Sequence, residues 1–569
     1  MKSLFGIWTS TLRRNILLLV LSMLLPTFEM SDSAQAAQKV YASYSALERS
    51  ISVTALEEFV RTGAVDESLA VYAQYLNRGQ LQELRRVLQS PIKANAVAVS
   101  QFLYTPQGEF LLRRLGEVIK TESRQEKSGF HALRSALILA AADPGGLTLL
   151  GLLREYPGSS IRIDLARTLG IASELEKMVS DTGKAMAAVS QKANIEAAVE
   201  QTSLSFAKLP DFRRKGKFVT SKKTYRFLDA VRNRFLLTDV YLPNGIDKVP
   251  VIVISHGVGT DSSNFEYLGS HLASHGFAVV VPNHPGSDTK QLSSLMKGSA
   301  NEVAEPNEFY NRPLDVKFVL DQVQQRNKSE FRGRLNFEQV GIFGQSFGGY
   351  TGLALAGAQI NFAQLQKDCK PQALKETWNV SLLLQCRALE LQSKSPLIKH
   401  NLRDERIKAV IAVNPITSSI FGETGLNNIK IPVMIVASSD DTVAPALYEQ
   451  ILPFSWIGNQ QKYLAVLQGG THFSAIGEGK GSTDQVGLPS NIVGDDPAQA
   501  RKYLNSLSLP FFQSYVAGMT KYAPYLNAAY AKAISSQPLG LNLIQSLTST
   551  ELAQAFNSGL KEIQKQQKP

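Results

Sequence analysis

Short apolar runs alternate with helical segments between residues 249 and 437, and this alternation constrains the fold more than any other feature. The runs are rich in valine and isoleucine and are apolar along their whole length, as in strands buried on both faces. Such strands, when they alternate with helices, form a mostly parallel sheet covered by helices, so the sequence predicts the α/β class. We expect strands at 218–228, 235–242, 249–255, 278–281, 339–343, 407–413 and 431–437, and helices at 264–275, 313–325 and 349–358.

A candidate nucleophile lies in the motif G-Q-S-F-G at residues 344–348, between a predicted strand and a predicted helix. In that setting the serine of G-x-S-x-G occupies a strained strand-to-helix turn, where its hydroxyl is exposed to substrate. Gly344 and Gly348 fit this turn because residues so close to the nucleophile have no room for a side chain. The sequence therefore predicts Ser346 as the nucleophile of a hydrolase.

A serine nucleophile needs a histidine base and an acid that orients it, in the chain order serine, acid, histidine for this fold. Only His400 and His472 follow the serine, and His400 precedes every well-placed acid. His472 stands in a tight loop after a predicted strand at 463–467, so we expect it to be the base. Asp440 and Asp441 both follow the strand at 431–437; we prefer Asp441, with Asp440 as the alternative.

Two backbone N–H groups are expected to form an oxyanion hole. One belongs to Phe347, directly after the nucleophile, and the other to Val258, in the loop after the strand at 249–255. His256 precedes the nucleophile, so we expect it to brace this loop. His284 is compatible either with the same structural role or with lining the substrate pocket.

Several motifs together resemble the platelet-activating-factor acetylhydrolase and dienelactone-hydrolase-like branch of the α/β-hydrolases. They are S-H-G-V-G at 255–259, L-A-S-H-G-F at 272–277, N-H-P-G at 283–286, the glycine-rich turn at 344–349 and T-H-F at 471–473. The resemblance covers about 218–474 and implies hydrolysis of short or oxidised acyl esters, often on lipids, without metal. Two residues depart from the pattern: Ser346 replaces the cysteine of true dienelactone hydrolases, and Gln345 stands where a histidine is common.

The 569 residues exceed what one core holds, since single cores stop growing at roughly 250–300 residues. Helical periodicity before residue 205 predicts an all-α domain, and this arrangement resembles uncharacterised exported cyanobacterial proteins, which implies no activity. We expect a signal peptide at 1–36, an N-terminal α-helical domain at 38–205, an α/β-hydrolase domain at 206–520 and a C-terminal helical tail at 521–569.

The first 36 residues have the features of an export signal. Lys2, Arg13 and Arg14 precede an apolar stretch at 16–25, and A-Q-A at 34–36 is a small-residue cleavage site. The stretch is about half of the roughly 20 residues that span a bilayer, although an uncleaved anchor is the alternative. We therefore expect a periplasmic or extracellular protein.

The chain has two cysteines, Cys369 and Cys386, and export favours a disulfide between them over two buried thiols. No cysteine or histidine pair has zinc-ligand spacing, so no metal or other cofactor is expected. The net charge of +11 is scattered, with no basic run interleaved with aromatic residues, which argues against nucleic acid. A soluble surface and a weak attraction to anionic lipid both remain compatible with it. Nothing in the sequence indicates an oligomeric state.

These observations favour an exported serine esterase acting on lipid-type or short-acyl esters. A serine peptidase of the oligopeptidase type is an alternative, but it would carry a repetitive β-propeller where this chain is helical. The other alternative is a non-catalytic envelope binding protein on a hydrolase fold, which does not require all of Ser346, Asp441 and His472.

Overall fold

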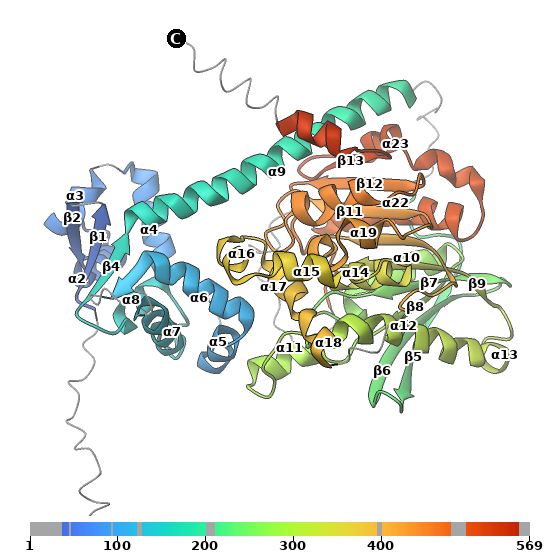
Figure 1. The fold of residues 1–569 in the computed structure, drawn as a ribbon, viewed down its shortest axis with the longest axis horizontal. Coiled ribbons are helices and arrows are strands. Elements are labelled where there is room, and N and C mark those ends of the chain that lie inside the picture. The colour runs from blue at the N-terminus through green and yellow to red at the C-terminus, as the bar shows by residue number, and fades with distance from the viewer. Residues whose placement is uncertain are drawn as a thin grey trace, which may run out of the picture. The chain divides into compact units, whose positions relative to one another are not determined.

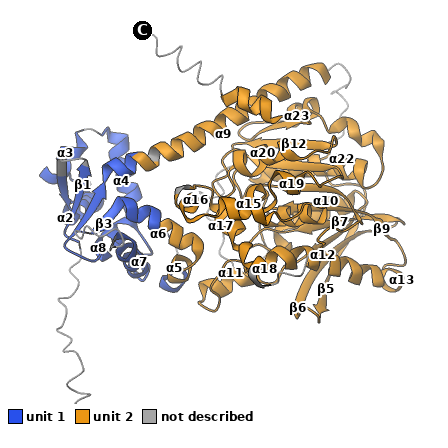
Figure 2. Cartoon of the chain, viewed as in Figure 1, with its two compact units in different colours: residues 1–99, 112–169 blue, residues 100–111, 170–569 orange. Residues whose placement is uncertain are grey.

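The computed structural model describes residues 37–44, 47–74, 76–92, 95–121, 128–200, 211–394, 401–479 and 497–556 (Figure 1). They fall into two units, coloured separately in Figure 2. The N-terminal unit comprises residues 1–99 and 112–169, and the large unit comprises residues 100–111 and 170–569. The expected signal peptide at 1–36 lies outside the described residues.

A nine-stranded sheet in the order β13-β12-β11-β10-β9-β7-β8-β6-β5 organises the large unit (Figure 1). Neighbouring strands from β12 to β8 are parallel, whereas β13, β6 and β5 pair antiparallel at the two edges. The mostly parallel sheet expected from the sequence is therefore confirmed. The strands are β5 (Thr220–Asp229), β6 (Arg234–Pro243), β7 (Val249–Ser255), β8 (Ala278–Pro282), β9 (Leu335–Gln345), β10 (Ile407–Val413), β11 (Val433–Ser438), β12 (Lys462–Gln468) and β13 (Gly540–Ile544).

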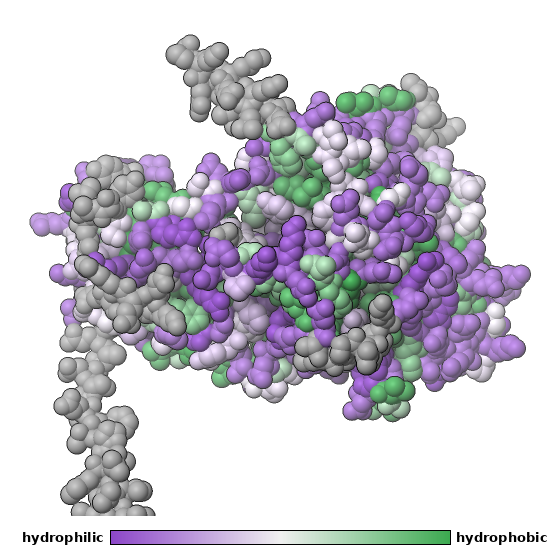
Figure 3. Space-filling view, viewed as in Figure 1, coloured by the Kyte–Doolittle hydropathy of each residue, from purple (hydrophilic) through white to green (hydrophobic). Residues whose placement is uncertain are grey.

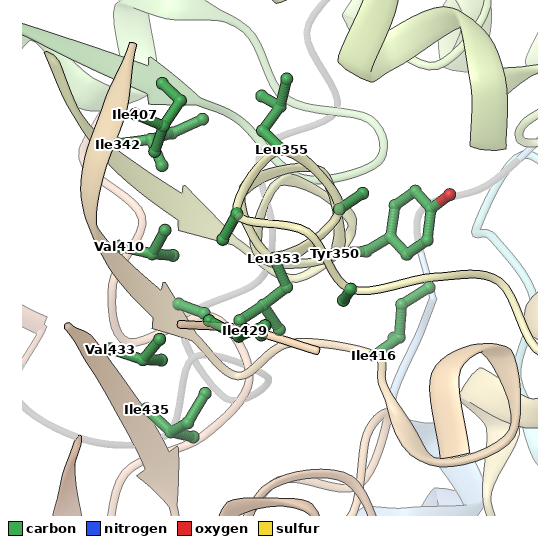
Figure 4. Packing of buried hydrophobic residues seen from close by; sticks show 14 of the residues in the cluster. Ile342, Tyr350, Leu353, Leu355, Ile407, Val410, Ile416, Ile429, Val433 and Ile435 are labelled. Carbon is green, nitrogen blue, oxygen red and sulfur yellow. The ribbon is translucent and has the colours of Figure 1, made fainter. Parts of the chain in front are cut away.

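Both faces of this sheet are buried under helices. Alternate residues of each strand point to opposite sides and therefore belong to two different cores. Val251 and Val253 of β7 belong to one core, with α12 (Glu308–Gln325) and α14 (Phe347–Leu355). Ile252 and Ile254 belong to the other, with α10 (Glu266–Ser274) and α22 (Pro497–Tyr515). Figure 4 shows the first core, where Leu353 of α14 lies over the strands. Each such side chain contributes roughly 1.5–3 kcal/mol through burial.

The two long connections after β8 and after α14 are largely helical. The first contains α11 (Thr289–Met296) and the start of α12. The second contains α15 (Phe362–Asp368), α16 (Pro371–Glu376), α17 (Val380–Arg387) and α18 (Leu389–Lys394). The expected disulfide between Cys369 and Cys386 is present and ties the end of α15 to α17.

The C-terminal segment is not only helical, contrary to the expected tail at 521–569. After α23 (Ala528–Ile534), β13 pairs antiparallel with β12 over five residues, from Gly540 opposite Gln468 to Ile544 opposite Leu464. Leu543 and Ile544 are fully buried, one in each core of the sheet. The segment therefore completes the sheet.

The long helix α9 (Leu165–Glu200) also departs from the expected boundary at residue 205, since from Gly170 onward it belongs to the large unit. Its buried apolar residues follow one another about one turn apart and join the core that contains α14: Ala185 with Met186, Val189, Ala193 and Ala197. Lys192 forms an ion pair with Glu551 at 2.7 Å, which fixes the same face of the helix.

The N-terminal unit is not all-α, which corrects the expectation for residues 38–205. It contains a mixed sheet in the order β2-β1-β4-β3, in which β1 and β4 are parallel and the outer pairs antiparallel. These strands have three to six residues, too short to stand out against helical periodicity. They are β1 (Lys39–Tyr44), β2 (Leu47–Ser52), β3 (Ile119–Thr121) and β4 (Ser160–Asp164).

Helices α2 (Val53–Thr62), α3 (Glu67–Ala73), α4 (Arg78–Gln89), α7 (Ser128–Ala140) and α8 (Leu149–Glu155) lie wholly within this unit. Two more, α5 (Ala96–Leu103) and α6 (Pro106–Val118), are divided between the units. On the face drawn in Figure 3, hydrophobic residues are scattered in small groups among hydrophilic ones. Within the described ranges, no helix combines the length and apolarity needed to cross a membrane.

Candidate active site

Ser346 stands at the turn between β9 and α14, where the sequence places the nucleophile. Its backbone has φ 54° and ψ −117°, a conformation that residues other than glycine seldom adopt. The turn is tight on both sides: a Cβ at Gly344 would collide with the carbonyl of Gly348, and one at Gly348 with the carbonyl of Ser255. The two glycines therefore permit the strained turn that presents the serine hydroxyl.

Ser346, His472 and Asp441 come together from three different strand ends. The Nε2 atom of His472 lies 2.9 Å from the Oγ of Ser346, and its Nδ1 atom lies 2.7 Å from Oδ2 of Asp441. All three side chains are more than nine-tenths buried. This is the geometry in which an imidazole accepts the proton of a serine hydroxyl while a carboxylate fixes its tautomer.

The structure separates the two candidate acids. Oδ1 of Asp441 accepts the backbone N–H groups of Val443 and Ala444 at 2.9 and 2.7 Å, which leaves Oδ2 for His472. Asp440 is exposed, and its carboxylate accepts the hydroxyl of Ser439. The geometry therefore places Asp441, and not Asp440, beside the imidazole.

The two expected oxyanion donors lie on adjacent segments. Phe347 is the first residue of α14, where N–H groups have no acceptor inside the helix. Val258 follows β7, and its N–H donates no hydrogen bond within the part of the chain that the structure describes. The carbonyl of Ser255, at the end of β7, packs directly on Gly348, so the Val258 loop adjoins the turn of the serine.

A buried network holds the Val258 loop in place. His256 accepts the backbone N–H of His284 at Nε2, which leaves its proton on Nδ1, 2.8 Å from the carbonyl oxygen of Gly257. The guanidinium of Arg312 donates to the carbonyl of His256 at 2.6 Å and lies over the ring of Phe347. Burial, with the nearby Arg312 cation, lowers the pKa of His256 well below its usual value, so this imidazole stays neutral. His256 thus braces the loop, as expected.

His284 belongs to a second serine–histidine–aspartate arrangement. Its Nε2 lies 2.9 Å from Oγ of Ser255, and its Nδ1 lies 3.1 Å from Asp315, which also pairs with Arg232 and Arg234. Side chains of all three residues are completely buried, and Ser255 belongs to a strand rather than to a strained turn. Burial therefore gives His284 a structural role and resolves the alternative left open by the sequence.

Two amide side chains, whose role the sequence did not reveal, hold the loop that carries His472 (the histidine loop). Gln345 donates to the carbonyl of His472 at 3.1 Å, and Asn414 donates to the carbonyls of Thr471 and His472 at 3.2 and 3.3 Å. Asn414 directly follows β10. A polar residue at the carboxyl end of a parallel strand is the sequence signal that could have identified it as part of the site. These bonds set the position of the loop from which the imidazole reaches Ser346.

Among the described residues, no group of three histidine, cysteine or acidic side chains is arranged to hold a metal ion. His400, the rejected candidate base, lies outside them.

A mostly parallel sheet with a serine on a tight strand-to-helix turn defines the α/β-hydrolase class. Residues 250–361 match the protein family described as "alpha/beta hydrolase fold". Residues 36–164 match another, described as "Alpha/beta hydrolase of unknown function (DUF1400)". The chain therefore has an α/β-hydrolase fold preceded by a DUF1400 region.

Platelet-activating factor acetylhydrolase of Bos taurus is distantly similar, with 25% identity over 138 residues. The match covers 18% of this chain and 31% of the bovine protein, less than a third of that relative's length.

Proposed function

We propose that this protein is a serine hydrolase that cleaves carboxylic esters, with Ser346 as nucleophile, His472 as base and Asp441 as the acid that orients it. The observation that carries the proposal is the continuous hydrogen-bonded chain from Ser346 through His472 to Asp441 at a strained turn.

In the first half of the reaction, Oγ of Ser346 attacks the ester carbonyl while Nε2 of His472 takes its proton. The carbonyl oxygen becomes an oxyanion, which the N–H groups of Phe347 and Val258 stabilise. The tetrahedral intermediate collapses, the C–O bond to the alcohol breaks, and His472 returns the proton to the leaving alkoxide. The alcohol departs and the acyl group remains on Ser346.

In the second half, His472 takes a proton from water, and the hydroxide attacks the acyl-enzyme carbonyl. The same donors hold the second oxyanion. Collapse breaks the bond to Ser346, whose oxygen recovers the proton from His472, and the carboxylic acid leaves. No metal or other cofactor is required at any step.

Lipid-type or short-acyl esters are the proposed substrates. The support is the distant similarity to platelet-activating factor acetylhydrolase together with the motifs shared along the catalytic segment. We further propose that the chain is exported through its first 36 residues, consistent with a disulfide in the insertion after α14. Weak attachment to anionic membrane surfaces is proposed from the net charge of +11.

The proposal is tested by hydrolysis of p-nitrophenyl esters of increasing chain length, phospholipids with short or oxidised acyl chains, and peptide amides. We expect turnover of acetyl and other short esters, none of peptide amides, and loss of turnover in Ser346→Ala. Preferential cleavage of peptide amides would instead identify a peptidase, and inactivity on every substrate would support a binding protein.

A further inference from the structure

The peptide group between Gly257 and Val258 is surrounded by donors on its carbonyl side. The carbonyl oxygen of Gly257 accepts hydrogen bonds from Nδ1 of His256 at 2.8 Å and from the hydroxyl of Thr260 at 3.1 Å. In addition, Nη2 of Arg312 lies 3.5 Å from this oxygen. All three donor side chains are more than nine-tenths buried. A carbonyl oxygen has two lone pairs, so this one is saturated with donors.

The N–H of the same peptide is the proposed oxyanion donor. A trans peptide is planar and its C=O and N–H point in opposite directions, so donors that fix the carbonyl of Gly257 also fix the direction of the Val258 N–H. On the other side of Val258, the N–H of Gly259 donates to the carbonyl of Ser287 at 2.9 Å. The loop is therefore held on both sides of Val258, whose own N–H has no acceptor among the described residues.

This peptide lies next to the nucleophile. Gly257 packs so closely on the turn of the serine that a Cβ there would collide with the side-chain oxygen of Gln345 and lie 3.4 Å from Cβ of Ser346. The other proposed donor belongs to Phe347, and Cζ of Arg312 lies 4.7 Å from the centre of its ring. Arg312 therefore contacts both segments that would form the oxyanion hole.

The charge of Arg312 is directed to the backbone and not to a carboxylate. The nearby carboxylates of Glu308 and Asp315 pair instead with Arg234. Nη2 of Arg312 donates to the carbonyl of His256 at 2.6 Å, whereas its Nε and Nη1 atoms have no hydrogen-bond partner in the described part of the chain. Burial lowers the pKa of Arg312 to about 10, so the guanidinium is still a cation at neutral pH. A buried cation next to peptide carbonyls polarises those peptides and makes their N–H groups more positive.

We propose that Thr260 and Arg312 are positioning residues for the oxyanion, because they hold the carbonyl of Gly257 and so direct and strengthen the N–H of Val258. The inference rests on the proposed ester hydrolysis. An N–H becomes a better donor when its own carbonyl accepts hydrogen bonds, by about 10–30% per bond. The oxyanion is absent from the bound substrate, so the two residues should affect kcat and leave KM nearly unchanged.

Thr260→Val tests the proposal most directly, since it removes the hydroxyl and retains the branched shape of the side chain. Losing a complete oxyanion donor costs about 10²–10³-fold, so we expect kcat for p-nitrophenyl acetate to fall about 5- to 20-fold, with KM within about twofold of wild type. Thr260→Ser keeps the donor hydroxyl and should restore kcat to within about twofold. The inhibition constant of a trifluoromethyl ketone, which binds the serine as a tetrahedral adduct, should rise in proportion to the fall in kcat.

Thr351→Val is the matched control. Thr351 is fully buried, and its hydroxyl likewise donates to a backbone carbonyl, that of Phe347 at 2.9 Å. This carbonyl shares its peptide with the N–H of Gly348, which is not a proposed oxyanion donor. The kcat of this variant should therefore stay within about twofold of wild type.

Two variants of Arg312 test the cation. Arg312→Met removes the charge and should lower kcat about tenfold or more, again with little change in KM. Arg312→Lys keeps a cation without the planar fork, so it should retain more of kcat than Arg312→Met. Calorimetry establishes that each variant is folded, and the Thr260 series decides the question if an Arg312 variant is not.

The proposal would be overturned by a kcat for Thr260→Val within about twofold of wild type, by a change in KM instead of kcat, or by a loss that Thr260→Ser does not restore. Each of these results comes from an active wild-type protein and leaves the hydrolase itself intact. A wild-type protein inactive on every ester would overturn the proposed function and this inference with it, so the two failures are distinguished.

Discussion

The two sheets of this molecule are buried in different ways. In the large unit, six of the seven residues of β7 are buried, because helices cover both faces of the nine-stranded sheet. In the N-terminal unit, two of the five residues of β4 are buried, and none of the three in β3. Strands buried on both faces must be apolar throughout, whereas strands buried on one face need only alternate. The large unit therefore depends on close packing around a fixed site, whereas the N-terminal unit tolerates an open cavity.

The largest expected effect is that of Ser346→Ala, which tests whether the large unit is the catalytic one. The hydroxyl is held by His472 and does not pack in a core, so activity should fall by several orders of magnitude while the thermal transition stays nearly unchanged. Esterase assays and calorimetry on the same preparation provide the measurement. Near wild-type turnover by the Ser346→Ala protein would show that this site of the large unit is not the catalytic one.

Asp441→Asn should reduce kcat by about 10²–10⁴-fold, because an amide cannot hold the imidazole of His472 in the productive tautomer. Asp440→Asn is the matched control, since the exposed carboxylate is bonded only to its neighbour Ser439 among the side chains described. Its kcat should remain within about threefold of wild type. The opposite ranking would transfer the orienting role to Asp440.

Gly348→Ala tests how tightly the large unit is packed at the turn. The added methyl would collide with the carbonyl of Ser255, so we expect a loss of about 3 kcal/mol or more in the free energy of unfolding. Gly183→Ala in α9 has open space around it and should stabilise by about 0.5–1 kcal/mol. Chemical denaturation compares the two, and equal effects would contradict the steric argument.

The smallest expected difference, about 2 kcal/mol, is between one leucine in each of the two interiors. Leu353→Ala in α14 removes a side chain that is fully enclosed in the core of the sheet, and should cost about 4–5 kcal/mol. Leu133→Ala enlarges an existing cavity, where fewer contacts are lost, and should cost about 2–3 kcal/mol. Equal losses in urea denaturation would indicate that the N-terminal unit is as closely packed as the large one.

The sequence predicted the sheet of the large unit well from β5 to β12, because its constraints are position-specific. Strands β7 and β10 were expected at their observed bounds, 249–255 and 407–413, since continuous apolar runs have sharp ends. Ser346, His472 and Asp441 followed from chain order and from the residues required at a strained turn, and the structure brings them within hydrogen-bond distance. Their catalytic roles remain a proposal.

The N-terminal sheet was missed because its signals are local and weak. The alternation of Ile161 and Ile163 in β4 extends over five residues, and its partners β1 and β3 lie more than 35 residues away in the chain. The contacts of Arg312 and those of Asn414, which hold two different loops, were missed for a related reason. Their partners are backbone carbonyls, which no sequence motif records.

The position of β13 has a consequence for how the chain is made. Residues 540–544 are synthesised well after β12 (462–468), yet they cover its outer edge. Until then β12 presents a row of unpaired N–H and C=O groups, and the histidine loop that follows it is attached to an unprotected edge. A nascent chain of this protein is therefore prone to pair with another until β13 has been made, and this edge of the sheet can be covered only after translation has passed residue 544.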